Sequence, residues 1–145
     1  MIFMSYGNDI NMTKIPKSQM SKTPNNDEKE KPQDLEERLL NFFIRVIKLC
    51  KKCPLNARTS RIISQLTGSA GSIPANYAEA SEAMSKKDFN KSIKIIRKEA
   101  KESQVWIRGL KEAVNFKDPE FDKLIQEAIE FICIFTSILK KTDKK

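Results

Sequence analysis

The sequence predicts an all-α protein built as an antiparallel, up-down-up-down four-helix bundle. Glycine (4) and proline (6) are scarce among the 145 residues, which argues against a turn-rich all-β fold. Four separate stretches repeat apolar residues at spacings of three and four, the pattern of one buried helical face. The connections between these stretches are short, and short connections favour antiparallel neighbours in a bundle.

Residues 1–33 are predicted to form a disordered tail and residues 34–145 the bundle. The first segment is polar and lacks helical periodicity, so it cannot bury enough apolar area to offset its chain entropy. Its first residues, Met1 to Met4, lack the basic region and long apolar core of a signal peptide. The most apolar stretch, Ala128 to Leu139, is shorter than the ~20 residues that a membrane span requires. We therefore expect a cytoplasmic protein that does not enter a membrane.

Two helices are predicted in the first half of the bundle. Asp34 is a good N-cap residue for the first helix, which should end before Pro54 because proline cannot continue it. The second helix is predicted from the apolar pattern that begins at Leu55 and reaches Tyr77. A run of small residues at 68–72 lies in its middle, where it allows close approach of another helix.

Two further helices are marked by capping residues. Ser85 is predicted to cap the third helix, with the Asp88 carboxylate placed to reach back as in a capping box. Asp118 followed by Pro119 predicts the start of the fourth helix, because proline at the first helical position loses no hydrogen bond. This helix is expected to run to about Lys141.

The fourth helix carries more apolar residues than one core-facing stripe requires. Because large exposed apolar patches are rare on monomers, the surplus predicts a homo-oligomer. The residues predicted at the oligomer interface are Phe131, Ile134 and Ile138 of the fourth helix and Trp106 of the third. The alternative is that this helix is simply well buried, or that the tail covers it.

The composition gives little indication of a catalytic or metal-binding site. The chain has no histidine, which removes the commonest general base and the commonest metal ligand. Cys50 and Cys53 have the C-x-x-C spacing, but a zinc site needs four ligands and the chain has only one more cysteine, Cys133. We expect reduced thiols, no cofactor and no enzymatic activity.

The positive charge of the chain is concentrated in the third helix. The chain has a formal net charge of +8. Residues 86–114 hold nine basic and four acidic residues, a local charge of +5. Five lysines with spacings of four, three, four and three lie within an arc of about 80°, opposite the apolar side. These are Lys87, Lys91, Lys94, Lys98 and Lys101.

This lysine ridge could follow the phosphates of a nucleic acid, or it could simply be a solvated helix face. Arg58 and Arg61 could extend the basic surface, or could pair with Glu99, which falls on the flank of the apolar side near Trp106. Trp106 is more consistent with core or interface packing than with base stacking, because one lone aromatic does not make a nucleic-acid groove.

The central residues resemble a known family. The segment from Ser72 to Glu79, S-I-P-A-N-Y-A-E, is the specific part of the likeness, and its neighbours Ser69, Ala70, Gly71 and Ala80 support it. Supporting residues are Gln65, Leu66, Ser85, Asp88, Phe89, Glu99, Ala100, Lys101, Glu102, Ser103 and Trp106. Over about residues 35–141, the chain resembles the four-helix-bundle proteins encoded in intervening sequences of 23S ribosomal RNA genes. It also resembles their relative, the accessory variability determinant of diversity-generating retroelements. Many members have Glu-Gly where this chain has Glu79-Ala80, so the second helix is expected to continue slightly further.

The resemblance implies a ring-shaped homopentamer without known enzymatic activity. For the retroelement relatives it also implies binding to nucleic acid and to a reverse transcriptase through a basic surface. Two main functional hypotheses follow: a homo-oligomeric scaffold that binds RNA or DNA without sequence specificity, and a protein-interaction module in which the lysines serve only solubility. Attachment to an anionic membrane is a weaker third, because the apolar residues opposite the lysines are needed for the core.

Overall fold

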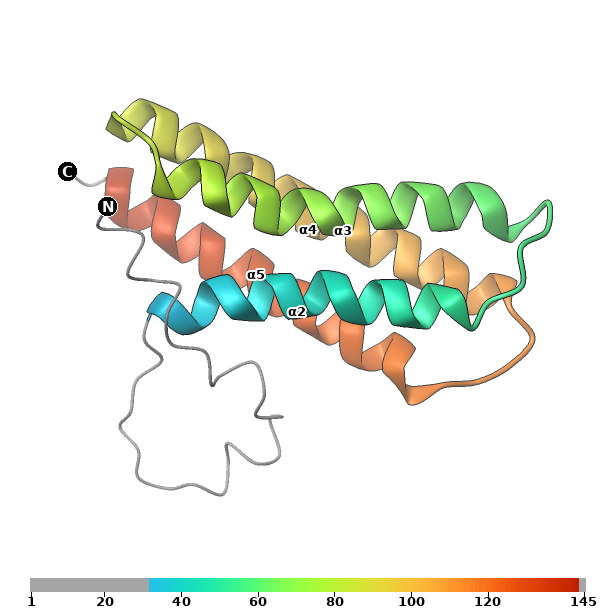
Figure 1. The fold of residues 1–145 in the computed structure, drawn as a ribbon. Coiled ribbons are helices and arrows are strands. Elements are labelled where there is room, and N and C mark those ends of the chain that lie inside the picture. Colours follow the sequence, from blue (N-terminus) through green and yellow to red (C-terminus); the bar gives the residue numbers. More distant parts are fainter. Residues whose placement is uncertain (1–31, 144–145) are drawn as a thin grey trace, which may run out of the picture.

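The computed structural model describes residues 32–143, with side chains from residue 35 onward, and it consists of four α-helices. The helices are α2 (Pro32–Lys51), α3 (Thr59–Ser81), α4 (Lys86–Ala113) and α5 (Pro119–Asp143). No strand occurs within this range. Figure 1 shows successive helices running in opposite directions, so the predicted four-helix bundle is confirmed.

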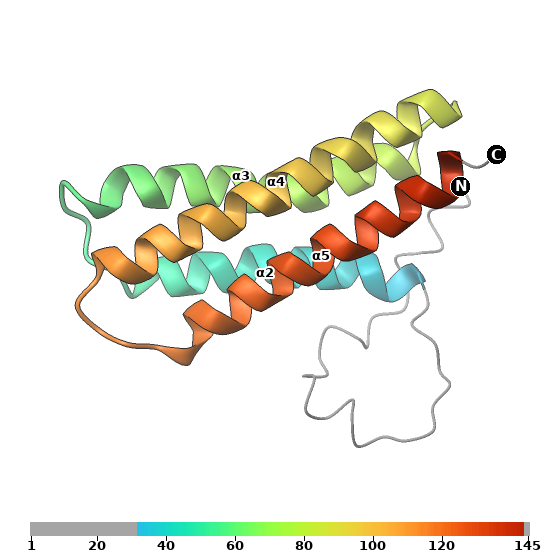
Figure 2. The same ribbon diagram turned by 180° about the vertical axis from the view of Figure 1, so that it is seen from behind.

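The contacts between helices follow the order of the chain around the bundle. The α3–α4 contact is the most extensive and the α4–α5 contact is second, whereas α2 meets α5 over a smaller area. The start of α2, the α3–α4 turn and the end of α5 lie at the same end of the molecule (Figure 1). Seen from behind, α4 and α5 lie in front, and α4 presents its whole length (Figure 2).

Of the predicted tail 1–33, residues 1–31 lie outside the described residues. Residues 32 and 33 already belong to α2, which begins at Pro32 rather than beside Asp34. The difference has a simple reason, since proline is well suited to the first turn of a helix, where its missing N–H is not needed.

The core is a continuous apolar cluster to which all four helices contribute. The Phe42 and Phe131 rings meet edge to face with centroids 5.3 Å apart, and Tyr77 meets Phe135 in the same way at 6.2 Å. Phe42, Phe131 and Phe135 have no exposed surface. Such edge-to-face pairs add to the free energy gained by burial alone.

Both predicted N-caps are present, but among the described residues no hydrogen bond joins the Ser85 backbone N–H to the Asp88 carboxylate, so the capping box is only half formed. The backbone N–H of Asp88 donates to Ser85 Oγ at 3.1 Å. The backbone N–H of Glu120 donates to Asp118 Oδ1 at 2.9 Å. These side chains accept hydrogen bonds from donors that have no partner within the helix, and so they fix where α4 and α5 begin.

The second helix starts later than predicted. Leu55 is 73% exposed and lies in the connection rather than in α3. Asn56 explains this, because its Oδ1 accepts hydrogen bonds from the backbone N–H groups of Arg58 (2.9 Å) and Thr59 (3.0 Å). A side chain that turns the backbone in this way delays the helix until Thr59.

The small-residue run of α3 allows a close packing contact with α2. A Cβ added to Gly71 would lie 2.9 Å from the Phe43 ring, so the ring rests directly on the glycine. Gly68, one turn earlier, has nothing within 4 Å of such a Cβ. The predicted close approach is therefore specific to Gly71.

Ion pairs join α2 to α5. Arg38 donates to both carboxylate oxygens of Glu127, at 2.7 and 2.9 Å, and to Glu130 at 2.6 Å. Its guanidinium also lies over the Phe131 ring, 5.3 Å from the centroid. Burial alone would lower the pKa of Arg38, but the hydrogen bonds and charges of the two glutamates raise it overall. Arg45 makes a similar pair with Glu120 nearby.

None of the helices in the described range combines the length and the apolar character that crossing a membrane requires.

Candidate nucleic-acid interface

The lysine ridge lies on the outer face of α4. All five lysines, Lys87, Lys91, Lys94, Lys98 and Lys101, are exposed. The residues that point the other way, among them Ile93, Ile96 and Ile107, are completely buried. Fourteen residues at 1.5 Å each separate the first lysine from the last, so the ridge is about 21 Å long. The structure confirms the predicted exposure of this face.

The lysine ridge does not help α4 to form. Like charges three or four residues apart on a helix are destabilising by about 0.2–0.5 kcal/mol per pair. Lysines alternating with glutamates would stabilise the same exposed face. The helix is held instead by its capping residue Ser85 and by the burial of its inner side against α3 and α5. The ridge is therefore a surface feature that the fold tolerates rather than one that the fold requires.

On the side facing α5 the ridge is bordered by further basic residues. Arg97 is half-buried and its Nη1 lies 3.5 Å from Thr136 Oγ1 of α5. Arg108 is exposed on the same flank. Along the helix the ridge ends at Val105, which is 62% exposed and lies directly in line with the lysines.

On the side facing α3 the charge changes sign. A groove of about 600 Å³ lies between α3 and α4. Three acidic residues, Glu79, Glu82 and Asp88, line it together with Ile95 and one lysine of the ridge, Lys91. Further along the same flank, burial raises the pKa of Glu99, and the nearby Glu102 carboxylate contributes to the rise. The lysine ridge is thus bordered by acidic residues on one side.

Arg58 and Arg61 are exposed, but the structure does not bring them to the ridge or to Glu99. Helices α3 and α4 are antiparallel, with Ser69 Oγ 2.9 Å from Ser103 Oγ. In this register Arg61 lies near residue 111, about 12 residues or 18 Å along the axis from Glu99. No ion pair in the described part of the chain includes either arginine.

The prediction that Phe131 lies at an oligomer interface is wrong. Phe131 has no exposed surface, because it packs against Phe42 and beneath Arg38 inside the protomer. The apolar pattern of the fourth helix was too broad to show which of its residues point inward. Its isoleucines are all half-buried.

Ile134, Ile138 and Trp106, the other residues predicted at the oligomer interface, are half-buried and do not share one surface. Ile134 follows Glu130, a partner of Arg38, by four residues and so lies on the flank of α5 that faces α2. Ile138, one turn further along, lines a hollow at the end of the bundle together with Met84 and Phe89. Trp106 follows Ile95 by eleven residues, three turns, and so lies on the flank of α4 that faces α3. Two exposed apolar residues, Leu40 and Ile44, instead lie one turn apart on the same face of α2.

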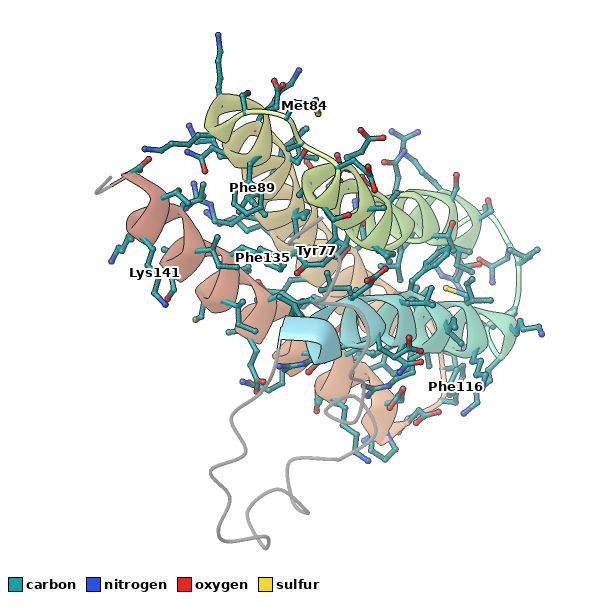
Figure 3. The ribbon with its side chains drawn as sticks, turned by 60° about the vertical axis from the view of Figure 1, so that its left-hand side comes forward. Tyr77, Met84, Phe89, Phe116, Phe135 and Lys141 are labelled. Atoms are coloured by element: carbon teal, nitrogen blue, oxygen red, sulfur yellow. The ribbon has the colours of Figure 1, made fainter. Side chains whose placement is uncertain are left out.

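A second hollow, of about 540 Å³, lies at the end of the bundle beside the start of α4. Figure 3 shows this end, with Met84 on the α3–α4 turn, Phe89 on α4 and Lys141 on α5. Its lining is largely apolar, and Lys86 and Lys141 supply its charges. Sequence analysis found neither hollow, because both are formed by residues from two or three helices.

The cysteines lack the features of a redox or metal site. Cys50 and Cys53 are buried, and burial together with the neighbouring Cys53 raises the pKa of Cys50 to about 11. Such a thiol stays protonated at neutral pH and is a poor nucleophile. Cys133 is exposed. Within residues 35–143 no group of three or more metal-ligating side chains comes together.

Comparisons with known proteins agree with this architecture. A family model described as "23S rRNA-intervening sequence protein" matches residues 34–137. A crystal structure from Bacteroides thetaiotaomicron, of a protein with unknown function from the S23 ribosomal protein family, is similar with 25% identity and a TM-score of 0.63. The likeness covers 73% of this chain and 98% of that one. No curated protein matches.

Proposed function

The chain belongs to the 23S rRNA-intervening sequence protein family, and from this premise we propose that it binds RNA or DNA without reading the sequence. We propose that it does so as a non-enzymatic homo-oligomer. The lysine ridge on the outer face of α4 is the observation that carries the proposal, since its five amino groups are all exposed.

The ridge suits the phosphate backbone rather than the bases. Each lysine that neutralises a phosphate releases counterions, which makes affinity depend steeply on salt and little on sequence. For five contacts to duplex DNA, the logarithm of the binding constant should fall with the logarithm of the salt concentration with a slope of about −4.5. Lysine also lacks the planar fork with which arginine recognises guanine, so base readout is not expected.

We propose that copies of the chain associate head to tail into a closed ring, with a pentamer as the expected size. Ile134 lies on the flank of α5 that faces α2, and Trp106 lies on the flank of α4 that faces α3. An interface that joins two different surfaces is heterologous, and such contacts form rings when the rotation closes. A ring would present several lysine ridges to one nucleic acid and raise the overall affinity. Sedimentation equilibrium tests this, and finding only single chains at micromolar concentration contradicts it.

Filter binding tests the nucleic-acid proposal. The test variant is Lys87→Glu, Lys91→Glu, Lys94→Glu and Lys98→Glu combined, which should abolish retention at low salt. A control variant with the same charge change elsewhere replaces Lys48, Lys51, Lys117 and Lys123, all exposed and outside the ridge. The control should keep most of the binding. If both variants lose the same share of nucleic-acid retention, net charge alone explains the binding. That result would contradict the assignment of binding to the ridge.

A reverse transcriptase is the protein partner that the resemblance to the retroelement accessory protein suggests. Such an enzyme works on the nucleic acid that the ridge is proposed to hold, so the two proteins would meet on the same strand. Co-purification from the native host that survives nuclease treatment supports direct contact. Loss of the enzyme after nuclease treatment shows that nucleic acid alone connects them.

A protein-interaction scaffold without a nucleic-acid role is the second candidate. It is favoured by Leu40 and Ile44, which are 40% and 37% exposed on the outer side of α2. Their replacement by lysine would block a protein partner but leave nucleic-acid retention unchanged. A chain that fails to retain nucleic acid at any salt concentration, yet captures one host protein through these residues, supports this second function.

A further inference from the structure

We infer that the lysine ridge takes duplex nucleic acid rather than a single strand. This inference rests on the proposed function and narrows its substrate class. Three properties of the surface formed by residues 35–143 carry it: the absence of a stacking platform, the straight and narrow shape of the ridge, and the acidic border along one side.

No aromatic side chain of residues 35–143 is in the exposed class. Residues 35–143 contain nine of them, and every one is buried or half-buried. The two aromatic residues of α4, Phe89 and Trp106, lie about 200° and 100° around the helix from Lys87, and both pack in or against the core. Proteins that hold single strands without sequence preference stack the bases on aromatic rings. Around this ridge the described surface offers charge and the exposed Val105 side chain but no aromatic ring, and a duplex uses such charge as fully as a single strand does.

The shape of the ridge suits a stiff partner. It is about 21 Å long and spans an arc of about 80° on one straight helix. A duplex holds its phosphates in fixed rows and stays straight over this distance, which corresponds to about six base pairs. A flexible strand must lose conformational freedom to align with the same line of charges, and it gains no stacking in return.

The acidic border limits wrapping. Glu79, Glu82 and Asp88 outnumber the one lysine, Lys91, in the groove beside the ridge on the α3 side. Glu102 is exposed on the same flank. A single strand increases its affinity by spreading over a broad positive surface, and here it would meet carboxylates. A duplex that touches only the crest of α4 keeps its phosphates away from them.

Fluorescence anisotropy with the full-length protein tests the inference. The probes are a labelled duplex of about 20 base pairs, as DNA and as RNA, and each labelled strand alone, at about 100 mM salt. We expect the duplexes to bind at least about tenfold more tightly than the strands. Single strands that bind as tightly as duplexes would overturn the inference while leaving the proposed function intact. Binding to neither kind of probe would overturn both.

A second variant extends the ridge. Val105 lies in line with Lys87 and is exposed, so Val105→Lys lengthens the row of charges by one without disturbing the core. Ala78→Lys is the matched control, because Ala78 is exposed on α3 away from the ridge. Val105→Lys should raise duplex affinity several-fold and steepen the salt slope by about 0.9. An equal gain for single strands, or an equal gain from Ala78→Lys, would contradict the inference.

Discussion

The two faces of α4 differ in how much they contribute to the stability of the fold. Ile93, Ile96 and Ile107 on the inner face are completely buried between α3 and α5. On the outer face, Lys94 and Lys98 are exposed and their side chains make no hydrogen bond or ion pair within the described residues. Residues on the inner face set stability, whereas those on the outer face are free to serve binding. Substitutions that separate the two properties therefore test whether this division is real.

The largest loss of stability is expected on the inner face. Ile96→Ala removes a fully buried side chain and leaves a cavity, which should lower the free energy of unfolding by about 2–5 kcal/mol. Lys98→Ala, two residues away on the outer side, should change it by less than about 0.5 kcal/mol. Urea unfolding followed by circular dichroism measures both. Similar losses for the two variants would show that the outer face is also part of the packing.

The next largest effect is expected where the interior is charged rather than apolar. Arg38→Ala leaves the carboxylates of Glu127 and Glu130 without their cation, and removes the contact with the Phe131 ring. Breaking a fully buried pair costs about 3–5 kcal/mol. Because Glu130 is 28% exposed, we expect about 2–3 kcal/mol here. Lys111→Ala, which breaks the exposed pair with Asp122, should cost less than about 1 kcal/mol.

Two glycines on α3 separate helix propensity from packing. Replacing glycine by alanine within a helix raises the free energy of unfolding by about 1 kcal/mol through helix propensity, and this contribution is the same at both positions. At Gly71 the new Cβ meets the Phe43 ring at 2.9 Å, whereas at Gly68 it meets nothing. We expect Gly68→Ala to raise the melting temperature and Gly71→Ala to be less stable than Gly68→Ala by about 1–3 kcal/mol. Equal gains would mean that Phe43 moves aside freely.

A smaller effect is expected from the buried hydrogen bond between α3 and α4. Ser103→Ala removes one partner of the 2.9 Å contact, while Ser69 Oγ can still donate to the Leu66 carbonyl. The expected loss is about 1 kcal/mol. Replacing both serines by alanine should be almost neutral, since no polar group is then left unpaired. A double variant with the summed loss of the two single ones would argue against this pairing.

The smallest effect concerns pH. The Lys52 ammonium and the backbone N–H of Glu120 hold the pKa of Asp118 below its usual value. Because the folded pKa is lowered, Asp118 contributes stability above its unfolded pKa of about 3.9, and this is lost as pH falls through the folded value. Asp118→Asn keeps a capping oxygen but loses the charge. The difference in melting temperature between the two proteins should therefore shrink from pH 7 to pH 3.

Much of the fold follows from local sequence signals. Ser85 and Asp118 mark two helix starts, and the caps form as predicted because they depend on neighbouring residues only. The lysine ridge is equally local, since its members lie on one helix. Sequence analysis placed the start of the second helix too early at Leu55, because the turn formed by Asn56 competes with the helix.

Features that depend on several helices could not be found in the same way. Phe131 was predicted at an oligomer interface because apolar residues surround most of α5. With so broad a pattern, periodicity does not show which side of the helix faces the core. No sequence signal indicated the ion pairs of Arg38, because its two glutamate partners lie about 90 residues away in the chain. The acidic groove beside the ridge arises only when α3 and α4 pack together. Each of these features depends on which residues of neighbouring helices lie side by side, and a single sequence does not contain this register.

Salt dependence of duplex binding is the most direct test of the central claim, that the outer face of α4 binds phosphates and does little for folding. The wild type is compared with a variant in which Lys87, Lys91, Lys94 and Lys98 are replaced by glutamine, with unfolding measured on the same samples. We predict a log–log slope near −4.5 for the wild type over about 50 to 200 mM salt, close to −1 for the variant, and no loss of stability. An unchanged slope in a folded variant would contradict the account.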